Sequence, residues 1–294
     1  MDIGIAVGDV RGPASAPDLL DQARQADSSG IGTIWASQAL GWDALIALTT
    51  VGTHLPRPRL GTAVVPIPQR HPLVLAAQAL SVQAATGNRL TLGIGAGIAA
   101  LTRHLYGHVA DRPARRVREY LDVLLPLLRG ESVDHRGETL VATGAVAVPG
   151  AEPPSTLLAA LGPAMLRVAG ELTDGTVTWM TGVRTLADHI VPTIGRHHPN
   201  PRVVAGLLTC VTDDETGTRQ RISEQFAIAG QVAEYRAVLD REGAANPGDV
   251  VVVGDEGAVT KHLARLRDAG VTDFLAVPYG TAEEQLRTLQ VLAG

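Results

Sequence analysis

Residues 59–97 read RLGTAVVPIPQRHPLVLAAQALSVQAATGNRLTLGIGAG and decide the fold of the chain. The apolar, β-branched start at Arg59–Val65 predicts a buried strand, which ends at the prolines that follow because proline cannot donate to a sheet. Pro72 suits the first position of a helix, and Gly87 suits its end. Arg89–Ile94 predicts a second strand. The stretch is therefore one strand–helix–strand unit, whose two strands are parallel and end side by side.

The same alternation continues on both sides of this unit. Within most of the predicted strands, apolar and polar residues do not alternate. Continuous apolar strands are typical of a buried parallel sheet. We expect eight strands, at Ile3–Val7, Thr33–Ala36, Arg59–Val65, Arg89–Ile94, Ser155–Ala160, Gly175–Trp179, Val203–Cys210 and Asp273–Val277. Residues 130–150 break the rhythm and predict a loop or small hairpin inserted after the fourth strand–helix unit. The sequence thus favours one (β/α)8 TIM-barrel domain over residues 1–294, with a doubly wound sheet as the alternative.

Composition narrows the class of protein. The chain has 294 residues, of which 45% are hydrophobic, and its formal net charge of -5 argues against nucleic acid as the main partner. The single cysteine, Cys210, allows no internal disulfide, and we expect it to be a small core residue. No stretch has the ~20 apolar residues of a membrane span, and the start lacks the features of a signal peptide. We therefore expect a cytoplasmic protein that acts on a small molecule, without a membrane partner.

Three glycines follow the strand at residues 89–94. Gly93, Gly95 and Gly97 do not form the dinucleotide fingerprint, because Ile98 stands where the third glycine of that motif would be. We also expect no helix directly after this loop. Backbone amides in such a loop can face the anion of a cofactor, but a tight barrel turn requires the same glycines.

Two other loops contain residues that suit a binding site. Leu158–Pro163 reads LAALGP and leads from a strand into a helix, so the amides after Gly162 either hold a phosphate or belong to a capped turn. Arg70 and His71 follow the third strand, where they contact a ligand or face solvent in a turn. Histidines elsewhere lack partners at the spacing that metal ligands need, so the sequence predicts no metal site.

Five segments together resemble the luciferase-like monooxygenase superfamily, most closely its branch that uses the deazaflavin coenzyme F420. They occur in the family's order and read LGTAVVPIPQRHPLVLAAQ, NRLTLGIGAG, LLRGESVDHRGE, LAALGPAMLRVAGELTDGTVTW and GDEGAVTKHLARLRDAGVTDF. The resemblance implies a (β/α)8 barrel that holds the cofactor at the carboxyl ends of its strands. It also implies a homodimer and a cis peptide bond at Ala63–Val64, in a bulge after the third strand.

The resemblance further implies site residues. The cofactor contacts implied are Ala63, Val64, Gly95, Ala96, Gly97, Leu161, Gly162, Thr178 and Trp179, with the phosphate at the Leu161–Gly162 backbone. Two catalytic elements of the family are missing. Members that oxidise alcohols or sugars carry Asp-His where this chain has Gln38 and Ala39, and Glu where it has Ile98. The nearest candidates for supplying a proton are His71, His104 and Tyr106.

Three functions stay open from the sequence. The first is an F420-dependent oxidoreductase that transfers hydride between the deazaflavin and a small organic substrate. The missing base favours reduction by such an enzyme over alcohol oxidation. The second function is an FMN-dependent monooxygenase, and the third is a barrel that binds or sequesters a cofactor without catalysis.

Overall fold

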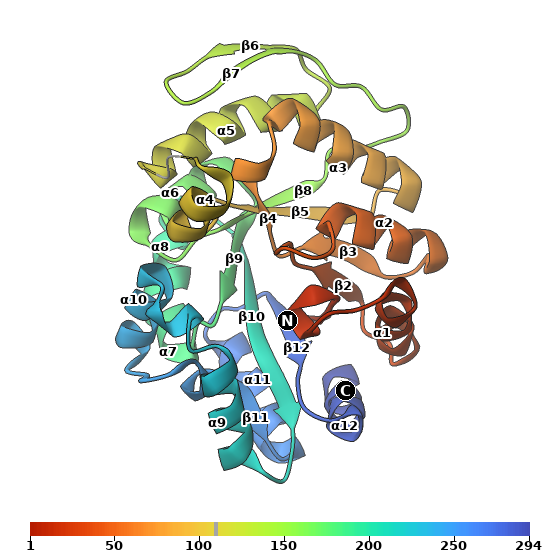
Figure 1. Ribbon diagram of the computed structural model, residues 1–294, viewed down its shortest axis with the longest axis vertical. Coiled ribbons are helices and arrows are strands. Elements are labelled where there is room, and N and C mark those ends of the chain that lie inside the picture. The colour runs from red at the N-terminus through yellow and green to blue at the C-terminus, as the bar shows by residue number, and fades with distance from the viewer. Residues whose placement is uncertain (109–110) are drawn as a thin grey trace.

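Parallel strands form the centre of the molecule. In chain order they are β1 (Asp2–Val7), β2 (Thr33–Ala36), β3 (Arg59–Thr62), β5 (Leu90–Gly95), β8 (Ser155–Ala159), β9 (Gly175–Trp179), β10 (Arg202–Val211) and β12 (Asp273–Pro278). The computed structural model describes residues 1–108 and 111–294, and within these ranges the eight strands pair in the order just given. The ring closes because β12 pairs with β1 (Figure 1). The predicted (β/α)8 barrel is confirmed, and the open doubly wound sheet is excluded.

Helices connect the strands and cover the outside of the barrel (Figure 1). They are α1 (Ala16–Ser28), α2 (Ala44–His54), α3 (Pro72–Thr86), α4 (Ala99–Tyr106), α5 (Pro113–Leu128), α6 (Pro163–Leu172), α7 (Val183–Thr185), α8 (Val191–Gly195), α9 (Glu215–Gln225), α10 (Ala233–Glu242), α11 (Glu256–Asp268) and α12 (Ala282–Ala293). α3 begins at Pro72 as expected and ends at Gly87, whose positive φ of 70° suits glycine. In the described ranges, none of the helices is both long enough and apolar enough to cross a membrane.

The unit at residues 59–97 folds as strand, bulge, helix and strand. The single strand expected here is interrupted, because β3 stops early and a short strand, β4 (Val65–Pro66), pairs with β5 instead. Between β3 and β4 the Ala63–Val64 peptide bond is cis, as predicted. Ser37, which follows β2, donates a hydrogen bond from its hydroxyl to the carbonyl oxygen of Ala63 at 2.9 Å. The loops after β2 and β3 are thereby joined.

Two elements differ from the sequence-based expectation. α4 starts directly after the glycine loop, where we expected no helix. Its N-cap residue is Ile98, whose side chain cannot accept a hydrogen bond, so the usual signal of a helix start is missing. The second element is β11 (Val252–Gly254), a strand of three residues that pairs with the end of β10 outside the closed ring.

Residues 133–144 form a hairpin outside the barrel. Its strands, β6 (Val133–Arg136) and β7 (Val141–Gly144), pair antiparallel and lie beyond α3 and α5 at the top of Figure 1. Glu119 of α5 accepts hydrogen bonds from the backbone amide and the hydroxyl of Thr139 at 2.8 and 2.7 Å. The inserted segment is therefore fixed to the helix layer.

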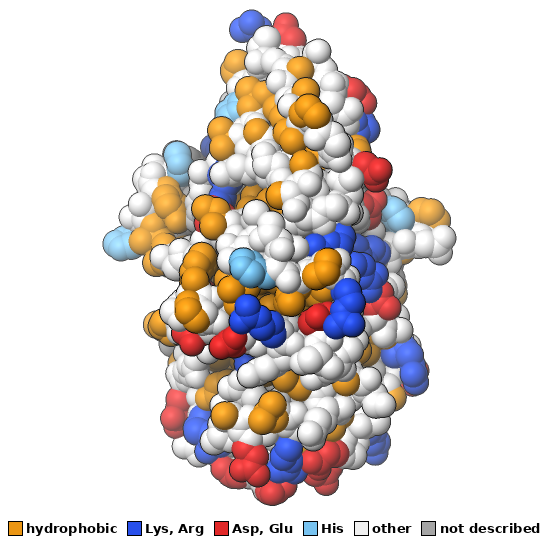
Figure 2. All heavy atoms as spheres, turned by 90° about the vertical axis from the view of Figure 1, so that its right-hand side faces the viewer, with side chains coloured by type: hydrophobic (Ala, Val, Ile, Leu, Met, Phe, Trp, Pro, Cys, Tyr) orange, Lys and Arg blue, Asp and Glu red, His pale blue; other side chains and the backbone are white. Residues whose placement is uncertain are grey.

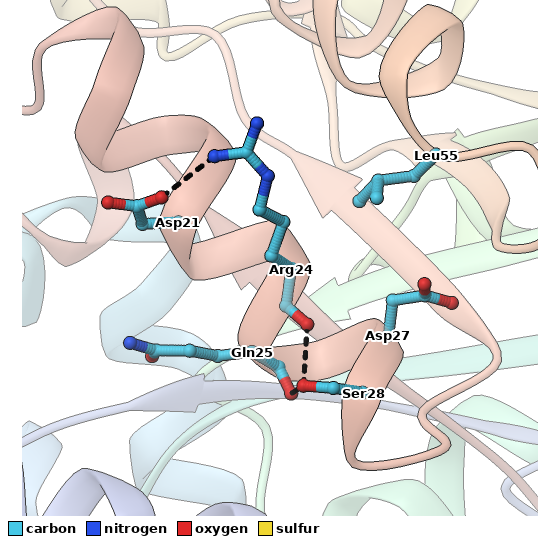
Figure 3. A pocket seen from close by; sticks show the side chains of 6 residues that line it. All are labelled: Asp21, Arg24, Gln25, Asp27, Ser28 and Leu55. Carbon is cyan, nitrogen blue, oxygen red and sulfur yellow. Dashed lines mark hydrogen bonds and ion pairs between the residues drawn. The ribbon is translucent and has the colours of Figure 1, made fainter.

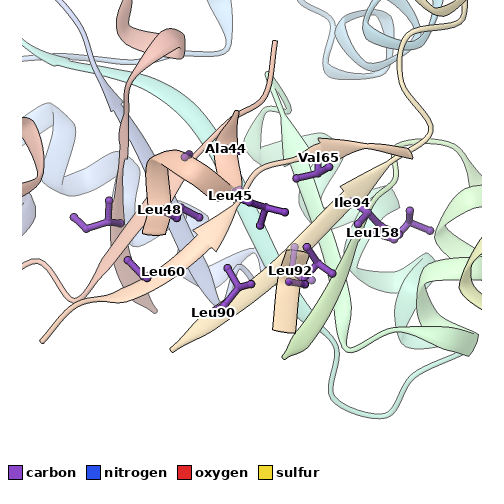
Figure 4. Packing of buried hydrophobic residues seen from close by; sticks show 14 of the residues in the cluster. Ala44, Leu45, Leu48, Leu60, Val65, Leu90, Leu92, Ile94 and Leu158 are labelled. Carbon is purple, nitrogen blue, oxygen red and sulfur yellow. The ribbon is translucent and has the colours of Figure 1, made fainter. Parts of the chain in front are cut away.

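The apolar core has an inner and an outer layer. Inside the barrel, Trp35 occupies space that two glycines leave free, because a Cβ on Gly4 or Gly61 would lie 2.4 or 2.3 Å from its indole ring. The outer layer lies between the strands and the helices. There, Leu45 of α2 packs with Leu60 of β3 and other buried side chains (Figure 4).

One side of the molecule exposes large apolar side chains. Ile46 of α2, Val74 of α3 and Val141 of β7 are 60%, 49% and 58% exposed. α3 packs against both α2 and β7, so the three side chains lie on adjoining elements. Figure 2 views the side that carries α2 and α3, and apolar side chains gather in its upper half. The homodimer implied by the resemblance stays a prediction.

Candidate active site

The predicted cofactor contacts come from four loops at one end of the barrel. Ala63 and Val64 follow β3, and Gly95 ends β5 with residues 96–97 after it. Residues 161–162 follow β8, and residues 178–179 end β9. These loops share the carboxyl end of the barrel, where TIM-barrel enzymes place their active sites. β3, β5, β8 and β9 are consecutive in the ring, so the structure places all of these positions on one side of the barrel mouth.

The glycines in β5 and in the loop after it allow close backbone packing and then expose the chain. A Cβ on Gly93 would lie 2.0 Å from the carbonyl oxygen of Thr62, and a Cβ on Gly95 would lie 2.9 Å from Val64 Cγ2. Gly97 has a φ of 76°, which is the left-handed region that favours glycine. Gly97 is also exposed. The first two glycines therefore let β5 pack closely against residues 62–64, and Gly97 leaves backbone accessible to a ligand.

The loop after β8 ends in an open helix N-terminus. Gly162 is the exposed N-cap of α6, no described side chain caps it, and a Cβ there would meet nothing within 4 Å. The first-turn amides and the helix dipole favour an anion at this place. Behind the loop, His189 Nε2 donates to the carbonyl oxygen of Leu161 at 2.9 Å. Burial lowers the pKa of His189, so the ring is neutral at pH 7 and acts as a single donor in this bond.

The end of β9 contributes an aromatic ring. Thr178 is buried, and its hydroxyl donates to the carbonyl oxygen of Val204 at 3.4 Å. Trp179 is only half-buried and meets Phe226 edge to face, with ring centroids 6.4 Å apart and planes at 62°. Trp179, rather than Thr178, therefore keeps side-chain surface available for a ligand.

Five polar side chains form a continuous hydrogen-bonded network across the loops after β2, β4 and β5. Arg70 forms an ion pair with Asp43 and donates to Gln38 Oε1 at 2.9 Å. Gln38 Nε2 donates to Gln69 Oε1 at 2.8 Å, and Gln69 Nε2 donates to Tyr106 Oη at 2.7 Å. Because the tyrosine oxygen is the acceptor in this last bond, its hydroxyl proton stays available for another acceptor.

Sequence reasoning did not find this network. Gln38, Gln69 and Tyr106 come from three separate loops, and amide side chains in loops have no characteristic spacing. One usable signal exists: the three loops follow neighbouring strands of the expected barrel, so their side chains share one edge of the mouth.

The two histidines predicted to supply a proton are placed differently from Tyr106. His71 is the N-cap of α3, where its Nδ1 accepts from the amide of Leu73 at 3.3 Å. Its Nε2 donates to the carbonyl oxygen of Val141 in β7 at 3.0 Å. Both ring nitrogens are therefore used in structural contacts, and the predicted catalytic role of His71 finds no support in this geometry. His104 is exposed on α4, two residues before Tyr106.

A groove at the other end of the barrel is not a candidate active site. It is lined by Asp21, Arg24, Gln25, Asp27, Ser28 and Leu55 (Figure 3). These residues belong to the carboxyl ends of α1 and α2, which lie near the amino ends of the strands. Arg24 is already paired with Asp21 at 3.0 Å. Residues at this end of a TIM barrel typically serve stability.

Three comparisons relate this chain to known proteins. A model of the luciferase-like monooxygenase family matches residues 3–291. A protein of Mycobacterium tuberculosis assigned as a coenzyme F420-dependent oxidoreductase is 27% identical, over 91% of this chain and 92% of that protein. The 5,10-methylenetetrahydromethanopterin reductase of Methanolobus tindarius is 25% identical, over 81% of this chain and 76% of the reductase. The solved structure of an F420-dependent secondary alcohol dehydrogenase, in complex with an F420-acetone adduct, shares the fold, with a TM-score of 0.82 at 15% identity over 99% of this chain and 97% of that one.

Proposed function

Because this chain belongs to the luciferase-like monooxygenase family, we propose that it is an enzyme of the F420-dependent branch. It transfers hydride between the deazaflavin and a small organic substrate. The observation that carries this proposal is the similarity, over 91% of the chain, to a relative assigned as an F420-dependent oxidoreductase. A second relative with a named activity is a reductase, which supports the same class of reaction.

The residues at the barrel mouth fit a cofactor that carries a phosphate. The exposed amides that follow Gly162 would hold the phosphate, since an open helix N-terminus favours an anion. The cis bulge at Ala63–Val64, the backbone of residues 95–97 and the ring of Trp179 would contact the rest of the molecule. When bound, F420 donates or accepts the hydride. The protein binds it, orients it and sets the polarity around it.

The side chains at the mouth favour reduction of the substrate. Alcohol oxidation needs a base that takes the hydroxyl proton. Gln38 does not titrate, and Arg70 and Gln69 hold its amide in place. Ile98 is an apolar N-cap and cannot accept a proton. Enones, imines and similar acceptors make a weaker demand, because they need only a proton donor.

Tyr106 is the side chain best placed to supply that proton. It lies on α4, directly after the glycine loop, and is 39% exposed. The bond from Gln69 fixes its oxygen at 2.7 Å and leaves the hydroxyl proton free for a substrate. Tyr106 is therefore our proposed proton donor, with water as the competing source.

A second candidate function is an FMN-dependent monooxygenase, because the matching family is described as luciferase-like monooxygenase. Fluorescence titration of the purified protein with F420 and with FMN separates the two. We expect tight binding of F420 and weak binding of FMN. Preferential binding of FMN would contradict the proposal, and tight F420 binding without turnover over a broad panel of acceptors would favour the sequestering barrel.

A variant at the phosphate position extends this titration. Gly162→Asp adds a negative charge at the open N-terminus of α6 and should lower F420 affinity by about 10-fold or more. Gly195→Asp is the matched control, because a Cβ there also meets nothing within 4 Å. Unchanged F420 affinity in a folded Gly162→Asp variant would place the phosphate elsewhere.

A further inference from the structure

A cavity of about 610 Å³ lies at the barrel mouth, at the ends of β10, β12 and β1. Its walls include Val10, Arg11, Leu208, Pro278, Glu284 and Gln285. In the closed ring of eight described strands, β10, β12 and β1 stand directly across from β3, β5 and β8. The cavity therefore faces the proposed cofactor positions from the opposite side of the mouth.

Arg11 brings an unbalanced positive charge to this cavity. Its Nη2 donates to Gln285 Oε1, and Gln285 is itself held by a bond from its Nε2 to the carbonyl oxygen of Gly280 at 2.9 Å. Nη1 is buried and has no hydrogen-bond partner among the described residues. Burial lowers the pKa of Arg11 to about 10, so the guanidinium is still charged at pH 7. A buried charge without a counter-ion is costly unless an anion binds beside it.

Two of the acidic groups near Arg11 are committed to other partners. Asp214 accepts from the amide of Gly217 at 2.9 Å and pairs with Arg221 at 3.1 Å. Glu284 accepts from Thr212 and from the backbone of Thr281 at the start of α12. Asp9 lies two residues from Arg11, and its Oδ2 packs against Gly41, where an added Cβ would be 2.1 Å away. This oxygen is buried and has no hydrogen-bond partner among the described residues, so Asp9 does not neutralise Arg11 through a direct contact. Within residues 1–108 and 111–294, no carboxylate forms an ion pair with Arg11.

We propose that the substrate of this enzyme carries a carboxylate or phosphate group, which binds beside Arg11 in this cavity. This inference rests on the proposed function, because it takes the molecule in the cavity to be the partner of the cofactor across the mouth. The carbon skeleton of the substrate lies against Val10, Leu208 and Pro278, which form an apolar wall next to Arg11. The substrate class is therefore a small organic anion with a reducible group.

Binding is tested on the cofactor-free protein by calorimetric titration. The probes are 4-oxopent-2-enoate, its uncharged methyl ester and propyl phosphate. A charge-assisted hydrogen bond predicts that at least one anion binds about 10-fold or more tightly than the ester. The tighter of the two anions identifies the group that the cavity accepts. Equal or weaker binding of both anions relative to the ester would overturn the proposal.

Two variants test whether Arg11 causes the tighter binding of the anion relative to the ester. Arg11→Gln should remove the preference for the anion over the ester. Gln285→Glu should remove it as well, because the side chain at position 285 already bonds to Arg11 Nη2 and a carboxylate there would neutralise the guanidinium charge. Arg24→Gln, in the groove at the other end of the barrel, is the control and should retain the full preference. A retained preference in both folded variants of the cavity would overturn the proposal.

The same proteins are titrated with F420 so that the two proposals can fail separately. Arg11→Gln should bind F420 as the wild type does, because Arg11 lies across the mouth from the cofactor positions. Loss of F420 binding in the wild type would overturn the proposed function, whereas the anion preference would still be measurable.

Discussion

At the scale of single residues, we predict that Tyr106 donates the proton to the substrate. Tyr106→Phe removes the hydroxyl proton that we propose is given to the substrate, while the ring stays on α4. Steady-state kinetics with reduced F420 and an enone should show a fall in kcat of about 10²-fold, the lower end for a general acid, because water can partly replace it. F420 affinity, measured by titration, should not change.

An unchanged kcat in Tyr106→Phe would mean that the proton comes from solvent or from a group such as His104. Gln69→Leu tests the contribution of the hydrogen bond that positions Tyr106. The variant removes the donor to the tyrosine oxygen and keeps the tyrosine proton. Its effect on kcat should be smaller than that of Tyr106→Phe.

His71 provides a test that separates its role as the N-cap of α3 from the predicted catalytic role. Asparagine is a good N-cap, so His71→Asn should keep α3 stable and leave kcat near the wild-type value. His71→Ala removes the cap and should lower the free energy of unfolding by about 1 kcal/mol, measured by urea denaturation. If kcat collapses in both variants while the fold survives, the imidazole is catalytic after all.

Single residues can be predicted from sequence where their type determines the backbone conformation, as glycine and proline do at the start of a helix. Gly162 before Pro163 indicates an open helix start, and the structure has an N-cap there. The rule does not extend to side chains that meet across loops. The contact of Gln69 with Tyr106 depends on α4, which no capping signal marks, so the hydrogen-bonded network could not be found without the fold.

At the scale of elements, α11 contains a group whose titration should affect stability. Burial lowers the pKa of His262 to about 4, with Arg265 and Arg219 acting in the same direction and Glu242 against them. An unfolded histidine has a pKa of about 6.5. Between these values the unfolded chain binds more protons than the folded chain, so the free energy of unfolding falls as the pH drops from about 6.5 toward 4.

His262→Gln should remove this contribution. Between about pH 7 and pH 5 the wild type should lose about 1–2 kcal/mol more than the variant, measured by urea denaturation at both values. His189 also has a lowered pKa and contributes in the same range, so the variant should retain part of the slope. Identical slopes in the two proteins would contradict the assignment to His262.

Element prediction failed where an element is short. β11 has three residues and lies outside the ring, so its apolar run is too brief to distinguish a strand from a buried loop. The expected strand at residues 59–65 is divided because the cis bond at Ala63–Val64 lies between β3 and β4. Long apolar runs such as β10 were predicted to within one residue at each end, since burial on both faces leaves little alternative.

At the scale of the whole molecule, the barrel explains how distant segments share one site. Loops after β3, β5, β8 and β9 form the side of the mouth where we propose the cofactor binds, and the ends of β10, β12 and β1 form the cavity with Arg11. Alternating strands and helices were enough to predict this arrangement, because parallel strands must expose their carboxyl ends together. The identity of the substrate could not be predicted in the same way, since it depends on loop side chains such as Arg11.

The direction of hydride transfer tests the central claim most directly. The assay compares oxidation of reduced F420 by a panel of enones and imines with reduction of oxidised F420 by a panel of alcohols and sugar phosphates. The resemblance implies that Gln38, Ala39 and Ile98 replace the catalytic groups of alcohol oxidisers, so turnover should occur with the acceptors and be slow or absent with the alcohols. Fast alcohol-dependent reduction of F420 would contradict the account, because it would require a base that the described mouth residues do not supply.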